Sequence, residues 1–275
     1  MSKKKANSIF LQDDFLIFSH RGGLALYPEN TMYAFKQSVK RFGADVLELD
    51  VHMTSDGQIV VIHDETLDRT TNGSGRVREM GLAQVKRLDA GHSFTTDGGK
   101  TYPCRNKGLT VPSLGEVFSC FSDRGVGINI EIKRPYPHIE KKLYKLILSH
   151  RMTDRVLVNS GYPLVLRRFR RLNKAGICTG ADFLDSLRAF TLSRLKLYKF
   201  YKTAADALQL PLWFKGRFRV VTGDMVELCK QKKLKLHVWT INSIKDMEKL
   251  IDLGVDGIMT DYPNKLYRLN PKIKS

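Results

Sequence analysis

The chain has 275 residues and a formal net charge of +18, and 42% of its residues are hydrophobic while 27% are charged. These proportions are ordinary for a globular protein and exclude a collagen-like, disordered or disulfide-stapled chain. The excess of positive charge favours partners that carry phosphate, such as nucleic acid, anionic lipid or a small phosphorylated molecule.

Predicted strands and amphipathic helices alternate along the chain. We expect eight strands, at residues 15–19, 45–51, 127–133, 156–159, 177–181, 205–210, 235–240 and 257–260. The helices expected between them cover residues 29–42, 113–121, 138–150, 163–174, 183–202, 223–232 and 244–253. This alternation predicts a parallel sheet, and eight β/α repeats are the number that closes a (β/α)8 barrel, or TIM barrel. Residues 1–275 are therefore predicted to form a single α/β domain.

One segment interrupts the alternation. A short further strand is expected at residues 58–62, after the turn-forming run TSDG, and residues 64–112 are rich in Gly, Thr, Arg and Asn. In a barrel this segment lies at the C-terminal ends of the strands, where insertions build active sites. We expect residues 64–112 to be a short insertion beside the site.

The strand at residues 45–51 places acidic residues where the barrel interior is expected. Side chains alternate across a strand, so Glu48 and Asp50 share one face and three apolar residues share the other. The apolar face would pack against helices, which directs both carboxylates into the barrel. Two carboxylates there repel each other unless a cation lies between them, and such oxygen ligands suit Mg²⁺ or Ca²⁺.

The strand at residues 127–133 repeats this inversion. Its three isoleucines share the outer face, which leaves Asn129, Glu131 and Lys133 inward. Glu131 is a candidate third metal ligand, and Lys133 is a candidate partner for a phosphate group. The alternative is a self-contained network of salt bridges in the barrel, which an unpaired couple such as Glu48 and Asp50 fits less well than a metal site.

Two histidines follow predicted strands directly. His20 comes after the apolar run FLIFS and precedes an Arg-Gly-Gly run, and His63 ends the strand at residues 58–62. A lone histidine at a strand end is more often structural, but barrel geometry places both of these on one rim with the carboxylates. Histidine is the side chain best suited to proton transfer near neutral pH. Zinc binding is the weaker alternative, since no cysteine accompanies the pair.

Seven runs of residues, taken together, are distinctive. They are HRGG at residues 20–23, PENT at 28–31, GADVLELDVHMTSDGQIVVIHD at 43–64, LDRTTNGSG at 67–75, IEIK at 130–133, VWTIN at 238–242 and GVDGIMTDYP at 254–263. In this order they resemble the glycerophosphodiester phosphodiesterase family. The resemblance covers residues 15–267 and implies a (β/α)8 barrel, which agrees with the count of predicted strands.

The resemblance implies catalytic and metal-binding roles. His20 and His63 would act as general acid and base, in an order that the sequence leaves open. Glu48, Asp50 and Glu131 would hold a divalent cation, Mg²⁺ or Ca²⁺.

Other matching residues would surround this centre. Arg21 and Lys133 would bind the phosphate, and Trp239 would line the substrate pocket. Glu29 and Asn30 would support the metal site through hydrogen bonds to its ligands. The insertion would cap the site.

The segment before and within residues 205–211 bears on the substrate. The run ADALQLP, with the long helix expected before it, resembles the branch of the family that has lysophospholipase D activity. Ten Lys or Arg and two acidic residues lie between residues 162 and 202, and the helix expected at residues 183–202 mixes these cations with aromatic residues. Such helices often lie on anionic membranes, although this one could simply pack on the barrel.

The sequence therefore predicts a metal-dependent phosphodiesterase. It would release glycerol 3-phosphate from glycerophosphodiesters, or lysophosphatidic acid from lysophospholipids. Two alternatives stay open: a phospholipase similar to sphingomyelinase D that forms a cyclic phosphate, and an anionic-lipid-binding protein with an inactive barrel site. No pattern typical of nucleic-acid-binding modules is present, so nucleic acid is not expected as a partner.

Cysteine usage and the N-terminus bear on location. Cys104, Cys120, Cys178 and Cys229 lie far apart and lack the spacing of a zinc site, and free thiols are typical of a reducing compartment. The first ten residues lack the apolar segment of a signal peptide, and no run approaches the roughly 18 apolar residues of a membrane span. We expect a cytoplasmic protein, with peripheral contact to a membrane where the basic helix allows it.

Overall fold

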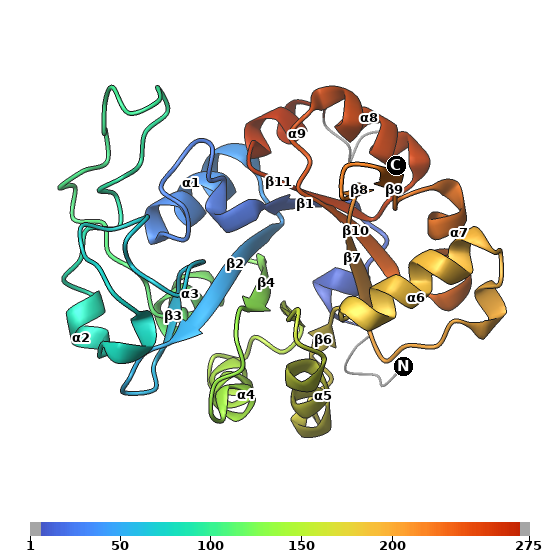
Figure 1. Ribbon diagram of the computed structural model, residues 1–275, viewed down its shortest axis with the longest axis horizontal. Coiled ribbons are helices and arrows are strands. Elements are labelled where there is room, and N and C mark those ends of the chain that lie inside the picture. Colours follow the sequence, from blue (N-terminus) through green and yellow to red (C-terminus); the bar gives the residue numbers. More distant parts are fainter. Residues whose placement is uncertain (1–6, 270–275) are drawn as a thin grey trace.

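The computed structural model describes residues 7–269, and within that range eight parallel strands form a barrel surrounded by helices (Figure 1). The hydrogen-bonded order is β6-β5-β4-β2-β1-β11-β10-β7, and a parallel bridge between Gly180 and Ala207 joins the two ends. The strands are β1 (Leu16–Ser19), β2 (Val46–Met53), β4 (Gly127–Ile132), β5 (Val156–Asn159), β6 (Cys178–Thr179), β7 (Ala207–Pro211), β10 (Lys235–Trp239) and β11 (Gly257–Thr260). The predicted (β/α)8 barrel is confirmed.

The helices occupy the outside of the barrel and follow the strands in sequence. They are α1 (Met32–Phe42), α3 (Leu114–Phe121), α4 (Ile139–Ser149), α5 (Pro163–Leu172), α6 (Phe183–Arg194), α7 (Gly223–Lys232), α8 (Ile244–Leu253) and α9 (Pro263–Leu269). Local sequence fixes several of their ends. The Ser113 hydroxyl accepts a hydrogen bond from the Glu116 N–H while the Glu116 carboxylate accepts one from the Ser113 N–H, a capping box.

Two apolar clusters between sheet and helices hold the barrel together. One packs the outward faces of β2, β4 and β5 against α3, α4 and α5, and the other packs β7, β10 and β11 against α7 and α8. Inside the barrel, a third cluster around Phe10, Phe18 and Val46 fills the N-terminal end. The polar side chains that point inward from β2, Glu48 and Asp50, follow Val46 along the strand and so lie nearer its C-terminal end.

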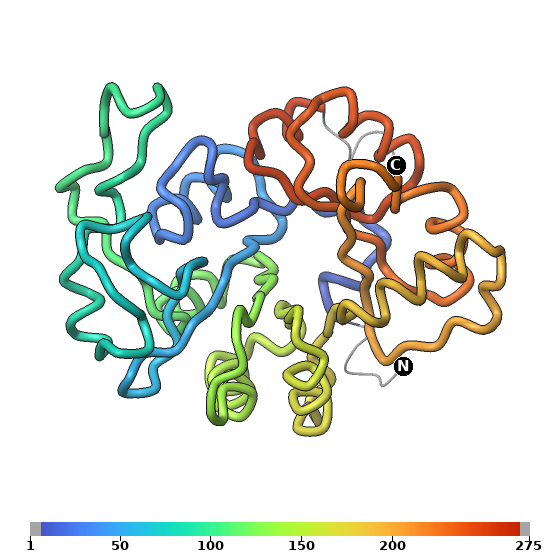
Figure 2. The backbone as a smooth tube through the Cα atoms, viewed as in Figure 1, coloured from blue at the N-terminus to red at the C-terminus, as the bar shows by residue number. Residues whose placement is uncertain are grey.

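The insertion at residues 64–112 forms an excursion at one side of the barrel, drawn from cyan to green at the left of Figure 2. It follows β3 (Ile59–Val61), which pairs antiparallel with β2, and it contains α2 (Leu82–Val85) among turns. Val77, Val85 and Val111 pack with Val60 and Ile62 into a small apolar cluster of their own. The insertion is therefore anchored to the strand that precedes His63.

Several elements differ from the sequence prediction, among them the helix expected at residues 29–42, which begins at Met32 with Thr31 as its N-cap. The helix expected at residues 183–202 ends at Arg194, where Lys196 adopts a left-handed conformation (φ +54°) and the Leu197 N–H donates to the Leu192 oxygen, and a 3-10 turn (Tyr198–Phe200) follows. A short hairpin, β8 (Trp213–Phe214) with β9 (Phe218–Arg219), was not expected, and neither was α9. Within residues 7–269, none of the helices reaches the length and apolar character that crossing a membrane requires.

Candidate active site

The carboxylates of β2 lie in the barrel as the alternation predicts. Glu48 and Asp50 are 2% and 1% exposed, although both are acidic. The ladder between β2 and β4 places Asp50 opposite Glu131. As a result, carboxylate oxygens of Glu48, Asp50 and Glu131 lie within 4.8 Å of one another.

This acidic cluster fits a divalent cation. Burial, together with the neighbouring charges of Asp50 and Glu131, raises the pKa of Glu48 to about 8. A carboxyl that is so costly to ionise gains most from a cation placed among the three groups. Three carboxylates supply the hard oxygen ligands that Mg²⁺ and Ca²⁺ take.

Asp50 also has protein cations beside it. Arg21 Nε lies 3.2 Å from Asp50 Oδ2, Lys133 Nζ lies 3.5 Å from Asp50 Oδ1, and the Asn30 amide donates to Oδ2 at 3.0 Å. Burial alone would raise the pKa of Asp50, but Arg21 and Lys133 outweigh it and hold that pKa below its usual value. The expectation that Glu48 and Asp50 form an unpaired couple is therefore wrong for Asp50. Part of the salt-bridge network considered as an alternative exists around the cluster.

Lys133 connects the two ligand strands. Its Nζ lies 3.3 Å from Glu131 Oε2 as well as near Asp50, and the charges of both carboxylates raise the pKa of Lys133 although burial opposes this. Lys133 is partly exposed, so its ammonium group borders the open side of the cluster.

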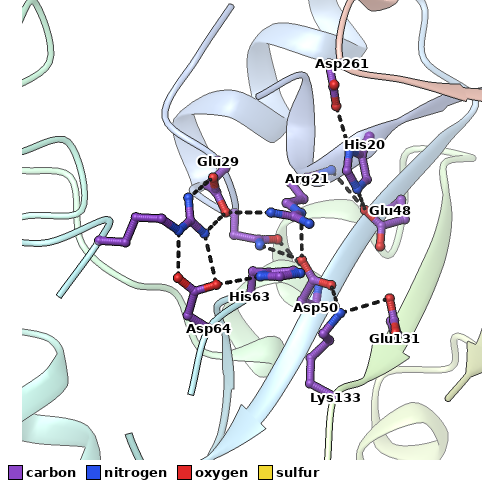
Figure 3. A network of polar contacts seen from close by, with 12 residues as sticks. His20, Arg21, Glu29, Glu48, Asp50, His63, Asp64, Glu131, Lys133 and Asp261 are labelled. Carbon is purple, nitrogen blue, oxygen red and sulfur yellow. Dashed lines mark hydrogen bonds and ion pairs between the residues drawn. The ribbon is translucent and has the colours of Figure 1, made fainter. Parts of the chain in front are cut away.

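His20 lies directly after β1, in a 3-10 turn (His20–Gly22). Its Nδ1 donates to Asp261 Oδ1 at 2.6 Å, because a carboxylate can only accept, and this leaves Nε2 facing Glu48 Oε2 at 3.9 Å (Figure 3). Burial is the largest influence on the pKa of His20 and lowers it. The hydrogen bond to Asp261 and the charge of Glu48 together outweigh burial, so the pKa of His20 is raised.

The turn after β1 also shapes the backbone. Arg21 adopts a left-handed conformation (φ +50°), which points its N–H at Glu48 Oε2, 3.0 Å away. Gly22, at φ +83°, packs so closely on α1 that a Cβ would lie 2.7 Å from the Ala34 Cβ. Non-glycine residues in this region of φ are uncommon and cluster at functional sites.

His63 is held in the same way on the other side of the cluster. Its Nδ1 donates to Asp64 Oδ1 at 2.6 Å, which leaves Nε2 without that proton. The backbone oxygen of His63 lies 3.0 Å from Nε2 of the buried His52. Figure 3 shows the His63 ring pointing toward Asp50.

Arg69, from the insertion, forms ion pairs with two acidic residues on this side of the site. Its guanidinium donates to both oxygens of Asp64 and to both oxygens of Glu29, at 2.6–3.2 Å. Hydrogen bonding to Arg69 lowers the pKa of Asp64 to about 2. Glu29 also accepts from Arg21 Nη1 at 3.1 Å, so a chain of ion pairs runs from His63 to the acidic cluster.

Trp239 is the one predicted site residue that lies apart. It ends β10, opposite Pro211 in the ladder with β7, and is 42% exposed at the mouth of the barrel. The other nine, His20, His63, Glu48, Asp50, Glu131, Arg21, Lys133, Glu29 and Asn30, lie in one connected polar site.

Sequence reasoning missed Asp64, Arg69, Asp261 and Asn242 as site residues. Asn242 donates to Asp261 Oδ2 at 2.6 Å and so fixes the carboxylate that holds His20. All four stand inside the distinctive runs, Asp64 directly after His63. A histidine that transfers protons at one ring nitrogen needs a hydrogen-bond acceptor at the other. This requirement could have pointed to Asp64 and Asp261.

Comparison with known proteins agrees with this geometry. The family model described as the glycerophosphoryl diester phosphodiesterase family matches residues 20–265. The chain belongs to this family. The resemblance found in the sequence motifs is thereby confirmed, and the chain is placed among the phosphoric diester hydrolases.

Individual relatives match over almost their whole length. A glycerophosphodiester phosphodiesterase of Caldanaerobacter subterraneus subsp. tengcongensis is 38% identical, over 92% of this chain and 97% of its own. A human lysophospholipase D, GDPD1, is 29% identical, over 90% and 83%. The solved structure of an Oleispira antarctica phosphodiesterase in complex with the product sn-glycerol-3-phosphate is 25% identical, with a TM-score of 0.72, over 94% and 97%.

Proposed function

We propose that this chain is a metal-dependent phosphodiesterase that hydrolyses glycerophosphodiesters to glycerol 3-phosphate and an alcohol. The observation that carries the proposal is the pair His20 and His63, each held at Nδ1 by an aspartate, with the acidic cluster between them. Family membership supports the same class of reaction. The relative whose solved structure contains sn-glycerol-3-phosphate as product supports the glycerol moiety.

Glu48, Asp50 and Glu131 would hold the cation, which we propose to be Mg²⁺ or Ca²⁺. When bound, a divalent cation stabilises negative charge that develops on the phosphoryl oxygens. Arg21 and Lys133, beside Asp50, would bind the same phosphate and add to that stabilisation. Glu29 and Asn30 would keep Arg21 and Asp50 in place.

The two histidines would move the protons. Water attacks phosphorus, the bond from phosphorus to the leaving oxygen breaks, and one histidine takes the proton from water at Nε2 while the other delivers a proton to the leaving alkoxide. Both Nε2 atoms are available for this because both Nδ1 atoms are bound to carboxylates. Either histidine fits either role.

A lysophospholipid is the second substrate that we propose. The similarity to human lysophospholipase D GDPD1 favours it, as does Trp239, an exposed aromatic side chain at the barrel mouth that would line the substrate pocket. Peripheral contact with an anionic membrane belongs to this proposal because lysophospholipids reside in membranes. A cytoplasmic location is proposed with it, since the four cysteines, all within residues 7–269, are thiols and not disulfides.

Chelation tests the metal-dependent phosphodiesterase. Purified protein incubated with EDTA and desalted should lose hydrolysis of glycerophosphocholine, and Mg²⁺ or Ca²⁺ should restore it. Glu48→Gln should weaken the response to added metal, and Glu248→Gln, on the outside in α8, serves as the matched control. Full turnover in chelator would refute the metal requirement.

A substrate comparison separates the remaining candidates. Glycerophosphocholine and lysophosphatidylcholine, offered separately, should both release choline if both proposed substrates are correct. Exclusive use of glycerophosphocholine would remove the lysophospholipid. Phosphorus NMR of the product distinguishes open from cyclic phosphate, and a lasting cyclic product would favour the sphingomyelinase D-like reaction. Binding of either substrate without turnover would favour an inactive lipid-binding barrel.

A further inference from the structure

The β8–β9 hairpin exposes aromatic side chains to an unusual extent. Trp213, Phe214 and Phe218 are 49%, 43% and 57% exposed, on two strands of two residues each. Phe214 pairs with Phe218 across the ladder, around a turn at Lys215 and Gly216. Exposed apolar side chains that lie close together are typical of an interaction surface. A hairpin that only connects β7 with α7 would not require exposed aromatic residues.

The hairpin stands at the mouth of the barrel. It begins two residues after β7 ends at Pro211, the residue that lies opposite Trp239 in the ladder with β10. In the order of strands, β7 lies across the barrel from β2, which carries Glu48 and Asp50. Figure 1 shows the insertion and the hairpin on different sides of the barrel.

Neighbouring segments at the same end also expose large apolar side chains. They begin α5, α6 and α8, the helices that follow β5, β6 and β10, so they too lie at the C-terminal ends of the strands. We call these residues, with the hairpin aromatics, the apolar rim: Tyr162, Leu164, Phe183, Leu184, Leu187, Trp213, Phe214, Phe218 and Ile244. The charged site residues come from β1, β2, β4 and the insertion, on the remaining part of the mouth.

Positive charge is interleaved with the hairpin aromatics. Lys215, Arg217 and Arg219 alternate with them, and residues 207–223 contain no acidic residue. Lys215 Nζ lies 5.7 Å from the centre of the Phe214 ring. Aromatic side chains beside Lys and Arg are the combination that binds the headgroup region of an anionic lipid layer.

Other occupants fit this surface less well. A second copy of the chain would bring the same cations of the hairpin face to face, on a protein whose net charge is already +18. Nucleic acid would use the cations and could stack on the aromatics, but the rim also exposes Leu164, Leu184 and Leu187, which offer no ring for a base. Aliphatic side chains match acyl chains instead.

We propose that the β8–β9 hairpin, with the apolar rim beside it, docks the mouth of the barrel onto an anionic lipid surface. The aromatic side chains enter the headgroup layer while Lys215 and Arg217 contact lipid phosphates. The barrel mouth then faces the layer, so a lysophospholipid headgroup reaches the acidic cluster without its acyl chain leaving the lipid. Docking itself needs no metal and no turnover, so it stands or falls separately from the proposed reaction.

Vesicle sedimentation tests the docking. The full-length protein is mixed with sucrose-loaded vesicles of phosphatidylcholine, or of equal parts phosphatidylcholine and phosphatidylglycerol. It should bind the second kind and leave the first largely unbound. Lys215→Ser with Arg217→Ser should weaken binding roughly 30-fold, since each basic residue near an anionic surface contributes about a fivefold gain in affinity. Trp213→Ser with Phe214→Ser and Phe218→Ser should weaken it by at least about tenfold.

Matched controls lie at the opposite end of the barrel. Leu148 and Leu172, in the last turns of α4 and α5, are exposed as well, so Leu148→Ser with Leu172→Ser removes apolar surface of the same kind. Arg171→Ser with Lys174→Ser removes two exposed cations near the same end. Neither pair should change vesicle binding, and circular dichroism should show every variant folded.

Three outcomes would overturn the proposal. The first is a wild-type protein that ignores anionic vesicles, and the second is vesicle binding that the control pairs weaken as much as the hairpin variants do. The third is a hairpin that mediates another contact, seen as a dimer in light scattering or as oligonucleotide binding that the aromatic variant abolishes while vesicle binding persists. Because hydrolysis is not the readout, failure of docking and failure of the proposed reaction remain distinguishable.

Discussion

His20 and His63 are oriented in the same way, each by a hydrogen bond from its Nδ1 to an aspartate. Each ring donates from Nδ1 to an aspartate at 2.6 Å, and each aspartate is itself held by a further donor, Asn242 for Asp261 and Arg69 for Asp64. Because a carboxylate can only accept, the proton of each neutral ring stays on Nδ1 and Nε2 presents its lone pair. Protonation at Nε2 then turns the same atom into a donor, which is what acid and base require.

Removal of either ring should therefore cost the rate expected of acid/base catalysis. We expect His20→Ala and His63→Ala each to lower kcat for a glycerophosphodiester about 10²–10⁴-fold. His150→Ala is the matched control, since His150 caps α4 and bonds to Leu146 there. Choline release measured under saturating metal checks this, and a wild-type kcat in either site variant would contradict the assignment.

Asp261 should matter only through His20. Asp261→Asn keeps the size of the side chain but loses the acceptor charge, so we expect kcat to fall about 10–100-fold while KM changes little. A double-mutant cycle distinguishes positioning from general destabilisation. In the His20→Ala background, Asp261→Asn should cost almost nothing further, and additive losses in kcat would refute the coupling.

Among the larger elements, the insertion contributes Asp64, which holds His63, and Arg69, which joins Asp64 to Glu29. Arg69 reaches from residues 64–112 to Asp64 and Glu29, and Glu29 in turn holds Arg21 beside Asp50. The apolar cluster around Val77, Val85 and Val111 keeps this segment folded against β3. The insertion thus links the support of His63 to the support of the acidic cluster.

This link predicts the effect of an arginine substitution. Arg69→Met keeps most of the aliphatic length but removes the paired donors, so we expect kcat to fall about 10–100-fold, the usual cost of losing such a supporting contact. Arg76→Met, on the same insertion beside the exposed Glu79, should leave kcat unchanged. Equal kcat values for the two variants would show that the ion pairs of Arg69 do not position His63.

Strand periodicity predicted the barrel and its inward carboxylates because β2 and β4, with eight and six residues, are long enough to show the alternation. It could not predict the hairpin, since strands of two residues are too short to show alternation, and Lys215-Gly216 is a weaker turn signal than Asn-Gly. The end of α6 was missed for another reason. Residues 195–202 contain no Gly or Pro, and the helix ends at a left-handed Lys196, a conformation for which glycine is the usual signal.

Considered as a whole, the barrel interior is layered from apolar to polar and charged. Along β2, Val46 lies in the apolar cluster at the N-terminal end, Glu48 lies deeper in the barrel and Asp50 lies nearer the open end. Across the barrel, beginning at the level where Asn129 lies opposite Glu48, four polar side chains from four strands bond to one another: Asn129, Asn159, Gln209 and His237. This polar layer lies beside the acidic site and is in register with it on β4 and β5.

His237 makes this layer sensitive to acid. It is fully buried, and burial, with a smaller effect from Lys235, lowers the pKa of His237 to about 3. Between that value and the ordinary histidine value of about 6.5, the unfolded chain binds a proton that the folded chain excludes. The contribution of His237 to the free energy of unfolding should therefore decrease as the pH falls below about 6.5, by up to about 1.4 kcal/mol per pH unit, while the raised pKa of Glu48 contributes a slope of opposite sign between about pH 4.5 and 8. Urea unfolding at several pH values measures that slope.

His237→Gln should remove the contribution of His237 to the slope, even if the variant is less stable at neutral pH. His138→Asn, at an exposed position, should keep the wild-type slope. An unchanged slope in His237→Gln would assign the acid sensitivity to other groups.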